Sequence, residues 1–276
     1  MLIIPDIHGR TFWKDAVRGR ENEKIIFLGD YVDPYPEEGL PEGALPRSFE
    51  EVAKMQLDSI QNLNEIIEFK KAHMDNVILL IGNHDAGYMF YDAGICKSRH
   101  DYKNQETIYH IFRDNFDLFQ IAYEEFINGK RYIFSHAGLS KEWMIDSHGY
   151  FGYDINPDNI VEMANLMFKS KEGLFIYNLG DIDSARARYS GDPYGSVVWA
   201  DVSEWLYEYV GQQKLTNYAF QVFGHTQLID KPLITKDIAC LDARRAFILN
   251  DEGIFCELDG TPCESGLKGI KPSYTR

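Results

Sequence analysis

The chain has 276 residues, of which 45% are hydrophobic and 14% aromatic, so it carries enough apolar material for a sizeable folded core. The formal net charge of -15 argues against the large positive surface that duplex nucleic acid requires, and no apolar run approaches the roughly 20 residues that span a bilayer. A motif residue already stands at position 6, which leaves no room for a secretory signal, and the four cysteines form no CxxC pair. We therefore expect a soluble, cytoplasmic protein with reduced thiols and no structural zinc.

Short apolar runs in the first half of the chain predict strands of a layered α/β core. The runs lie at residues 2–4, 24–28, 77–81 and 131–134, and each is mainly apolar without alternation, which is typical of strands covered on both faces. Residues 49–71, between the second and third runs, place apolar side chains at helical spacing. Asn128 and Gly129 stand between two β-prone runs and predict a hairpin turn. The alternation of strands and helix indicates sheets layered against helices.

Two long segments, residues 86–126 and 140–198, do not end in a polar cluster at a strand end. We expect both to be insertions over the core of a single domain, residues 1–276, where they form a candidate cap; the first is expected to be helical around residues 105–119. The last third of the chain returns to strand patterns in FQVFG, IACLDA, AFILN and IFCEL, which we expect to form a second sheet packed on the first. Residues 34–46 contain four prolines and predict an irregular loop.

Polar residues follow five of the apolar runs at their C-terminal ends. These residues are Asp6, His8, Asp30, Asn83, His136 and His225. The C-terminal ends of neighbouring strands lie together in α/β sheets, so we expect the six side chains to converge on one site. Carboxylates, imidazoles and an amide carbonyl suit Mn²⁺, Fe or Zn²⁺, with Mn²⁺ preferred here, and six ligands exceed what one ion with an open position needs. We therefore predict two divalent metal ions.

Two neighbouring ions need a bridging ligand, and Asp30 is the predicted bridge because a carboxylate has two oxygens. Such a pair lowers the pKa of a bridging water, and the hydroxide formed would attack phosphorus while the metals neutralise phosphate oxygens. The leaving oxygen then needs a proton. His84, directly after Asn83, is the predicted general acid, kept protonated by a neighbouring carboxylate such as Asp33.

The same residues form an ordered set of motifs. They read Asp6-Ile7-His8, Gly29-Asp30-Tyr31-Val32-Asp33, Gly82-Asn83-His84-Asp85, His136 and Gly224-His225. In this order they resemble the signature of the calcineurin-like metallophosphoesterase superfamily. The resemblance implies an α/β fold of two packed mixed β-sheets flanked by helices, with an acid role for His84 and an orienting role for Asp33. It assigns the metal ligands as Asp6, His8 and Asp30 for one ion, and Asp30, Asn83, His136 and His225 for the other.

Within the superfamily, the chain is most similar to the phosphoprotein phosphatase branch, which includes the bis(5'-nucleosyl)-tetraphosphatases. The segments that carry this similarity are DIHG, GDYVD, SHAGLS and VVWADV. Nuclease and phosphodiesterase branches usually carry GHxH, whereas Gln227 stands at the place of the second histidine here. The missing imidazole and the negative net charge both argue against a nuclease.

Two arginines that grip phosphate in that branch are absent from this chain. Pro34 follows the GDYVD motif, and Ile81 precedes the GNHD motif, where the arginines usually stand. An arginine fork pairs with two phosphate oxygens, which a lysine does not reproduce. The candidate replacements are Arg10, Arg186, Arg188, Arg244 and Arg245.

The leading hypothesis is a dinuclear metal-dependent phosphomonoesterase of the serine/threonine phosphatase type, acting on a small phosphomonoester, a phosphoprotein or a nucleotide. One alternative is a bis(5'-nucleosyl)-tetraphosphatase or another nucleotide pyrophosphohydrolase, for which Tyr88, Phe90 and Tyr91 offer rings that could stack on a nucleobase. A second alternative is a non-catalytic protein that binds a phosphorylated ligand. The retention of the six expected ligands and His84 favours an enzyme.

Overall fold

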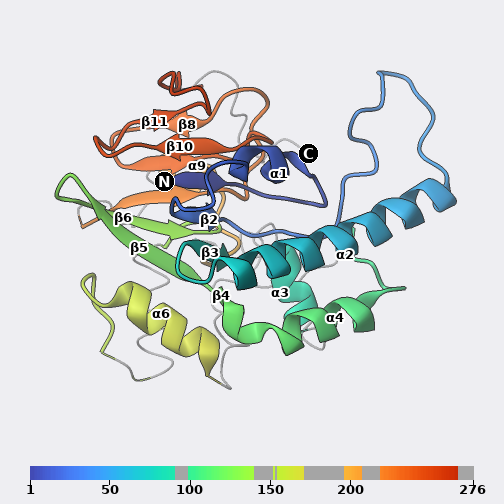
Figure 1. Cartoon of the computed structure of the whole chain (residues 1–276), viewed down its shortest axis with the longest axis horizontal. Helices are drawn as coiled ribbons and strands as arrows, with labels where there is room; N and C mark the ends of the chain where they lie inside the picture. The colour runs from blue at the N-terminus through green and yellow to red at the C-terminus, as the bar shows by residue number, and fades with distance from the viewer. Residues whose placement is uncertain (91–98, 140–151, 153, 171–195, 207–217, 267–276) are drawn as a thin grey trace.

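Two β-sheets form the centre of the protein, and helices flank them (Figure 1). The computed structural model describes residues 1–90, 99–139, 152, 154–170, 196–206 and 218–266. The first sheet has the order β11 (Phe255–Cys256), β10 (Phe247–Leu249), β1 (Leu2–Ile4), β2 (Ile25–Phe27), β3 (Val77–Leu80) and β4 (Phe119–Gln120). The second has the order β5 (Ala122–Ile127), β6 (Lys130–Ser135), β7 (Phe220–Phe223), β9 (Ile238–Cys240) and β8 (Leu233–Ile234). The described helices are α1 (Phe12–Val17), α2 (Phe49–Ala72), α3 (Asn83–Met89), α4 (Gln105–Asp114), α6 (Ile160–Lys169) and α9 (Val202–Leu206), with a 3-10 turn η2 (Phe116–Leu118).

Both sheets are mixed, with a parallel centre. Strands β1, β2, β3 and β4 run parallel to their neighbours, and β10 pairs with β1 in the antiparallel direction. In the second sheet β6, β7 and β9 are parallel, while β5 and β8 are antiparallel edge strands. The expected fold class, two packed mixed sheets flanked by helices, is confirmed.

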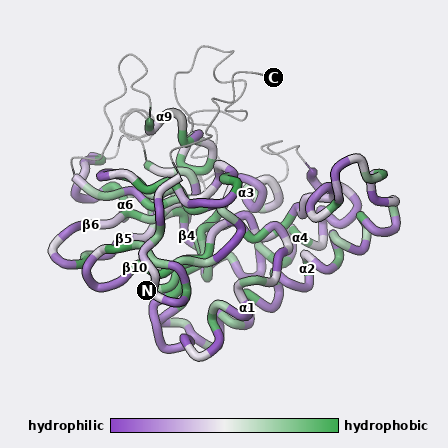
Figure 2. The backbone as a smooth tube through the Cα atoms, turned by 90° about the horizontal axis from the view of Figure 1, so that it is seen from above, coloured by the Kyte–Doolittle hydropathy of each residue, from purple (hydrophilic) through white to green (hydrophobic). Residues whose placement is uncertain are grey.

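The strands of the first sheet are covered on both faces. Leu2 and Phe27 belong to the apolar cluster that includes the helices. Ile3 and Ile26 point the other way and pack with residues of the second sheet such as Phe134. Double coverage explains why these strands are apolar at every position in the sequence. Figure 2 shows hydrophobic stretches gathered around the strands and hydrophilic ones on the outer loops.

Helix α2 covers the predicted helical segment and begins with a capping box. The Ser48 side chain accepts the N–H of Glu51 at 3.3 Å, and the Glu51 carboxylate accepts the N–H of Ser48 at 2.8 Å. Ile60, Leu63 and Ile67, in the middle and the second half of the helix, are buried in the core. The first half, together with the loop that leads into it, extends away from the sheets (Figure 1).

The hairpin turn is confirmed, with φ of 48° at Asn128 and 74° at Gly129 between β5 and β6. Other boundaries differ from expectation. The end of segment 86–126, expected within an insertion, supplies β4 to one sheet and β5 to the other, and the helix expected at about 105–119 ends at Asp114. Strands β10 and β11 join the first sheet, because β10 pairs with β1. An apolar run predicts a strand, but it does not indicate which other strand will pair with it.

Much of the second expected insertion, and three residues named from the sequence, lie outside the described residues. Of segment 140–198, the structure describes 152, 154–170 and 196–198. Arg186, Arg188 and Tyr91 fall in the remaining parts of the chain. The function of both segments as a cap therefore stays a prediction.

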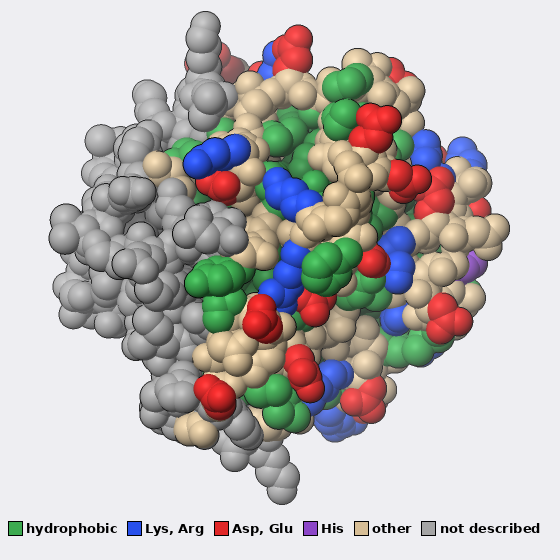
Figure 3. Space-filling model, turned by 90° about the vertical axis from the view of Figure 1, so that its left-hand side faces the viewer, with side chains coloured by type: hydrophobic (Ala, Val, Ile, Leu, Met, Phe, Trp, Pro, Cys, Tyr) green, Lys and Arg blue, Asp and Glu red, His purple; other side chains and the backbone are tan. Residues whose placement is uncertain are grey.

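Acidic and basic side chains are mixed on the face of the protein that Figure 3 shows. On the face in Figure 3 they lie interspersed with apolar groups, so this face carries no field of a single sign. None of the described helices combines the length and the apolar character that crossing a membrane requires.

Candidate metal centre and active site

The C-terminal ends of parallel strands from both sheets meet at one site. The predicted residues follow these strands, with Asp6 and His8 after β1, Asp30 after β2, Asn83 after β3, His136 after β6 and His225 after β7. Nδ1 of His136 lies 2.9 Å from the carbonyl oxygen of Leu28, and this bond joins the strand ends of the two sheets. The expected convergence of the six side chains follows from this arrangement.

Four residues of the site have left-handed backbone conformations. The φ angles are 42° at His8, 53° at Asp30, 59° at Asp33 and 63° at His225. Residues other than glycine rarely adopt this backbone conformation, because it costs on the order of 1–3 kcal/mol per residue. Such strain persists only where the surrounding structure enforces it, and it gathers at functional sites. The backbone at these strand ends is therefore strained, and the strained conformation places the side chains in the site.

Two motif glycines allow carboxylates to approach the backbone. A Cβ atom on Gly82 would lie 2.0 Å from Oδ1 of Asp30, and one on Gly224 would lie 2.0 Å from Oδ1 of Asp6. Neither carboxylate could keep its position beside a larger residue. The glycines of the GNHD and GH motifs are thus required by packing against the site.

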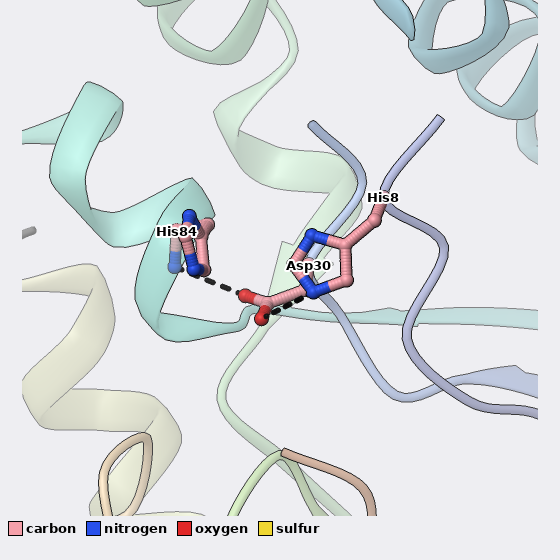
Figure 4. Close-up of side chains that lie close together, drawn as sticks. All are labelled: His8, Asp30 and His84. Atoms are coloured by element: carbon pink, nitrogen blue, oxygen red, sulfur yellow. Dashed lines mark hydrogen bonds and ion pairs between the residues drawn. The ribbon is translucent and has the colours of Figure 1, made fainter. Parts of the chain in front are cut away.

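Asp30 lies at the centre of the site (Figure 4). Its Oδ1 accepts the backbone N–H of His84 at 3.0 Å. Its Oδ2 lies 3.3 Å from Nε2 of His8 and 3.5 Å from Nε2 of His136. Asp85 stabilises the turn that carries Asp30, because its carboxylate accepts the backbone N–H of Asp30 at 2.7 Å. One carboxylate oxygen is thus shared between two imidazoles.

The imidazole of His8 presents a lone pair to this oxygen. Its Nδ1 lies 2.9 Å and 3.1 Å from the carbonyl oxygens of Val32 and Asp33, which only accept hydrogen bonds, so Nδ1 carries the proton. In the neutral ring Nε2 has no proton, yet it faces Oδ2 of Asp30. Two acceptors that face each other are stabilised by a cation between them, and a backbone carbonyl behind the ring is the usual support of a metal-binding histidine.

The other half of the site repeats this pattern. In the neutral ring, the bond of His136 Nδ1 to a carbonyl leaves Nε2 with a lone pair, and Nε2 faces Oδ1 of Asn83 at 3.0 Å and Nδ1 of His225 at 3.2 Å. Nδ1 of His225 lies 3.1 Å from the same Asn83 oxygen. An amide oxygen and two imidazole nitrogens at these distances form a set of donors that fits a divalent cation.

Burial and mutual charge set the protonation states of these groups. Burial and the nearby His136 lower the pKa of His225 to about 3, and burial also lowers the pKa of His8. Burial alone would raise the pKa of Asp30, but the neighbouring histidines, His136 first, hold it well below its usual value. Burial and the charge of Asp30 raise the pKa of Asp6. Neutral imidazoles and an ionised Asp30 are the forms that bind metals.

Within the described residues, two groups of side chains can each hold a metal ion, and Asp30 belongs to both. The groups are Asp30, His136 and His225, and His8, Asp30 and His84, with donor atoms that lie within 4.8 Å of one another. Asp6 is not part of the second group as it stands, since its carboxylate accepts the backbone N–H of His225 at 3.0 and 3.1 Å. The shared carboxylate fits the expected bridge between two ions.

His84 is held through both ring nitrogens. Its Nδ1 lies 2.6 Å from Oδ2 of Asp33, and its Nε2 lies 3.1 Å from Nη2 of Arg99. Tyr88 donates its hydroxyl hydrogen to the other oxygen of Asp33. Because each nitrogen has a partner in the protein, the ring suits proton transfer better than metal ligation.

Arg99 is the principal residue that the sequence did not reveal. Its Nε donates to the carbonyl oxygen of Asp33 at 3.3 Å, and its guanidinium carbon lies 3.6 Å from the ring centroid of Tyr35. A guanidinium on an aromatic face beside His84 is well placed to meet an anion at the site. Arg99 belongs to no motif and follows no apolar run, so no pattern in the sequence marks it.

Asp242 was also missed, although the sequence does carry a signal for it. The residue follows the apolar strand β9, as the predicted ligands follow theirs. It is buried, and burial together with the charge of Asp6 raises its pKa well above the usual value. Its Oδ1 has no hydrogen-bond partner within the described part of the chain.

Of the predicted arginines, Arg10 and Arg244 lie beside the site. Arg10 donates from Nη1 to the carbonyl oxygen of Asp6 at 3.2 Å and from Nε and Nη2 to the carboxylate of Glu38 at 3.0 and 2.7 Å. Arg244 approaches the same carboxylate, with Nη1 at 3.9 Å from Oε1. Both arginines thus meet on Glu38 at the edge of the site.

Other residues predicted from the sequence to bind substrate make contacts with other parts of the protein instead. Arg245 donates to both carboxylate oxygens of Glu257 at 3.0 and 2.9 Å, just beyond β11. The Tyr88 ring is fully buried and stacks on His100 at 4.1 Å between centroids, so it offers no face to a nucleobase. Phe90 packs against the apolar core.

The family model described as calcineurin-like phosphoesterase matches residues 2–227. The chain belongs to the calcineurin-like phosphoesterase family. The resemblance of the motifs is therefore confirmed at the level of the family, and membership makes this protein a phosphoric ester hydrolase. The non-catalytic alternative is set aside on the same ground.

Solved structures of other phosphatases share this calcineurin-like phosphoesterase fold. A cold-active protein-tyrosine phosphatase of the psychrophile Shewanella sp. aligns with a TM-score of 0.54 at 14% identity, over 94% of this chain and 78% of that chain. Another structure of a cold-active protein tyrosine phosphatase gives 0.54 at 14% identity, over 94% and 76% of the two chains. At this identity the likeness supports the fold alone. Comparison with curated proteins found no match.

Proposed function

We propose that the protein is a dinuclear metal-dependent phosphomonoesterase. The observation that carries the proposal is the position of Asp30 Oδ2 between lone-pair nitrogens of His8 and His136. The proposed ligands are Asp6, His8 and Asp30 for one ion, and Asp30, Asn83, His136 and His225 for the other. The mixed oxygen and nitrogen donors favour Mn²⁺, with Fe or Zn²⁺ as the alternatives. The carboxylate of Asp6 would turn from the His225 backbone toward the ion.

His84 supplies the proton for the leaving oxygen, and Asp33 positions it for this role. Two bound divalent cations would lower the pKa of a water molecule toward neutrality and neutralise charge on the phosphoryl oxygens. Asp33 holds the Nδ1 proton of His84 through the 2.6 Å contact, which orients the ring and favours its protonated form. His84 then donates from Nε2 to the leaving alkoxide.

Arg99 is proposed to bind the phosphoryl group. Its Nη2 donates to Nε2 of His84 in this structure, and an arginine has no acceptor, so that contact requires an unprotonated Nε2. A dianionic phosphoryl group is a better partner for the guanidinium than a neutral ring. When the guanidinium turns to two phosphoryl oxygens, Nε2 is released to carry the proton that His84 donates. Arg99 would thus replace the arginines that are missing from the GDYVD and GNHD motifs.

A monoester is favoured as the substrate because it presents three non-bridging oxygens, enough for both an arginine fork and two cations. The absence of the second histidine at Gln227 argues against a diester substrate. A nucleotide anhydride remains the alternative, although Tyr88 is not available to stack on its base. Within the family, the proposal belongs to the phosphoprotein phosphatase branch.

Three substrates distinguish these activities. Metal-stripped protein, reconstituted with Mn²⁺, is expected to hydrolyse p-nitrophenyl phosphate with a higher kcat/KM than bis-p-nitrophenyl phosphate or a dinucleoside tetraphosphate. The reason is that only the monoester offers three free oxygens at the scissile phosphorus. A higher kcat/KM on the diester or on the tetraphosphate would contradict the proposed substrate class.

A further inference from the structure

The proline-rich loop at residues 34–46 brings two side chains to the edge of the site. The rings of Tyr35 and His8 form a T-shaped contact with centroids 4.8 Å apart, and the Arg99 guanidinium lies over the Tyr35 ring. Glu38, three residues later, holds Arg10. The sequence marked this loop only as irregular, and the proposed reaction uses none of its side chains.

Two arginines lie over the Tyr35 ring. The guanidinium carbon of Arg99 is 3.6 Å from its centroid, and that of Arg10 is 5.4 Å from it. Arg99 is the proposed ligand of the scissile phosphoryl group, so Arg10 lies near that group and against the same aromatic ring. The main-chain oxygen of Asp6 accepts from Arg10 at 3.2 Å, which ties this second arginine to the metal centre.

The Glu38 carboxylate lies in a cradle of two guanidinium groups. Arg10 donates to both of its oxygens, and Arg244 approaches Oε1 at 3.9 Å. Burial raises the pKa of Glu38, but the bonds from Arg10 outweigh this effect and the pKa is lowered. An ionised carboxylate held by two positive groups leaves one positive charge in excess. This excess stands out in a chain with a net charge of -15.

The cradle is open to the solvent. The side chains of Glu38 and Arg244 are 29% and 43% exposed, while that of Arg10 is 14% exposed. A purely structural ion pair needs one arginine, and Arg10 alone satisfies both oxygens of Glu38. Arg244 has a φ of 60°, a conformation that non-glycine residues rarely adopt, beside this same carboxylate. A second arginine at 3.9 Å is poised for an anion larger than a single carboxylate.

We infer that Arg10 and Arg244 bind a second anionic group of the substrate, a phosphate or a carboxylate, and that Glu38 occupies this position until the substrate displaces it. The inference rests on the proposed phosphomonoesterase function and names its substrate class, a compact phosphomonoester that carries another anion. A substrate without a second anion leaves Glu38 in place and gains nothing from the two arginines, whereas a second anion displaces Glu38 and takes over its ion pairs. The two arginines would therefore favour phosphomonoesters that carry a second anion over those that do not.

Matched substrates test this inference. Phenyl phosphate, 4-carboxyphenyl phosphate and 1,4-phenylene bisphosphate share one ring, and the last two add a carboxylate or a phosphate. The wild type is expected to have a higher kcat/KM on at least one doubly anionic substrate than on phenyl phosphate. The larger of the two gains identifies which anion the cradle binds.

Two substitutions should shift this preference in opposite directions. Arg244→Ala is expected to lower kcat/KM on the preferred doubly anionic substrate about 10-fold and to leave phenyl phosphate unchanged, since one charged hydrogen bond is lost. Glu38→Gln is expected to raise the preference about 3-fold, because the competing charge is gone. Arg113→Ala is the control, since this exposed arginine on α4 pairs with Asp114.

The outcomes separate this inference from the proposed function. Equal losses on all three substrates in Arg244→Ala, or a reduced preference in Glu38→Gln, would show that the cradle is structural and overturn the inference. An equal kcat/KM on all three substrates in the wild type would do the same. Failure to hydrolyse phenyl phosphate at all would instead contradict the phosphomonoesterase. Arg99→Ala should lower all three activities alike, because it acts on the phosphoryl group that they share.

Discussion

His84→Asn is expected to lower kcat on phenyl phosphate by about 10²- to 10⁴-fold while both metal ions stay bound. The substitution removes the proton that Nε2 delivers to the leaving oxygen, whereas the proposed ligands keep their positions. The backbone N–H of residue 84, which donates to Asp30, is also retained. Steady-state kinetics and metal content of the purified variant measure both parts of this prediction.

The leaving group gives a sharper version of the same test. p-Nitrophenolate leaves without a proton far more readily than phenolate, so the loss on p-nitrophenyl phosphate should be smaller than the loss on phenyl phosphate. His110→Asn is the matched control, because His110 lies partly exposed on α4. Loss of a metal ion in His84→Asn would mean that His84 is a ligand with His8 and Asp30, and the acid role would be wrong.

Asp30→Asn is expected to weaken both metal ions together, by more than about 100-fold in affinity. The reason is that Oδ2 of Asp30 faces His8 on one side and His136 on the other. An amide keeps the size of the side chain but not its charge or its second donor oxygen. Turnover should fall with metal content, as measured by titration of the metal-stripped variant with Mn²⁺.

Asn83→Ala serves as the comparison for this experiment. Its side-chain oxygen faces His136 and His225 but not His8, so its removal should weaken one ion and spare the other. If Asp30→Asn also lost a single ion, the bridging role of Asp30 would be refuted.

The strand ends were predictable because two independent patterns agree there. Apolar runs covered on both faces mark where strands such as β1, β2 and β3 end, and parallel neighbours deliver the following residues to one edge. Short motifs at these ends then specify Asp30 and Asn83 at fixed distances from the strands. Local sequence is sufficient for such residues because the backbone itself carries them to the site.

The partners of these residues were not predictable, since they arrive from elsewhere in the chain. Arg99 reaches His84 from outside any motif, and Glu38 reaches Arg10 from an irregular loop. Asp85 stands inside a motif, but its task, accepting the backbone N–H groups of residues 30, 31 and 82, depends on the approach of two strands. The pairing of β10 with β1 was not predictable either, because the two strands come from opposite ends of the chain. Contacts between distant segments depend on tertiary packing, which residue patterns do not encode locally.

The central claim is that two metal ions act together at the shared Asp30. The most direct test is a titration of metal-stripped protein with Mn²⁺, following bound metal and phenyl phosphate turnover in the same samples. We predict that turnover rises to its maximum only as the second equivalent binds, because each group of ligands around Asp30 must be filled. Full turnover at one equivalent, or turnover that persists without metal, would contradict the account.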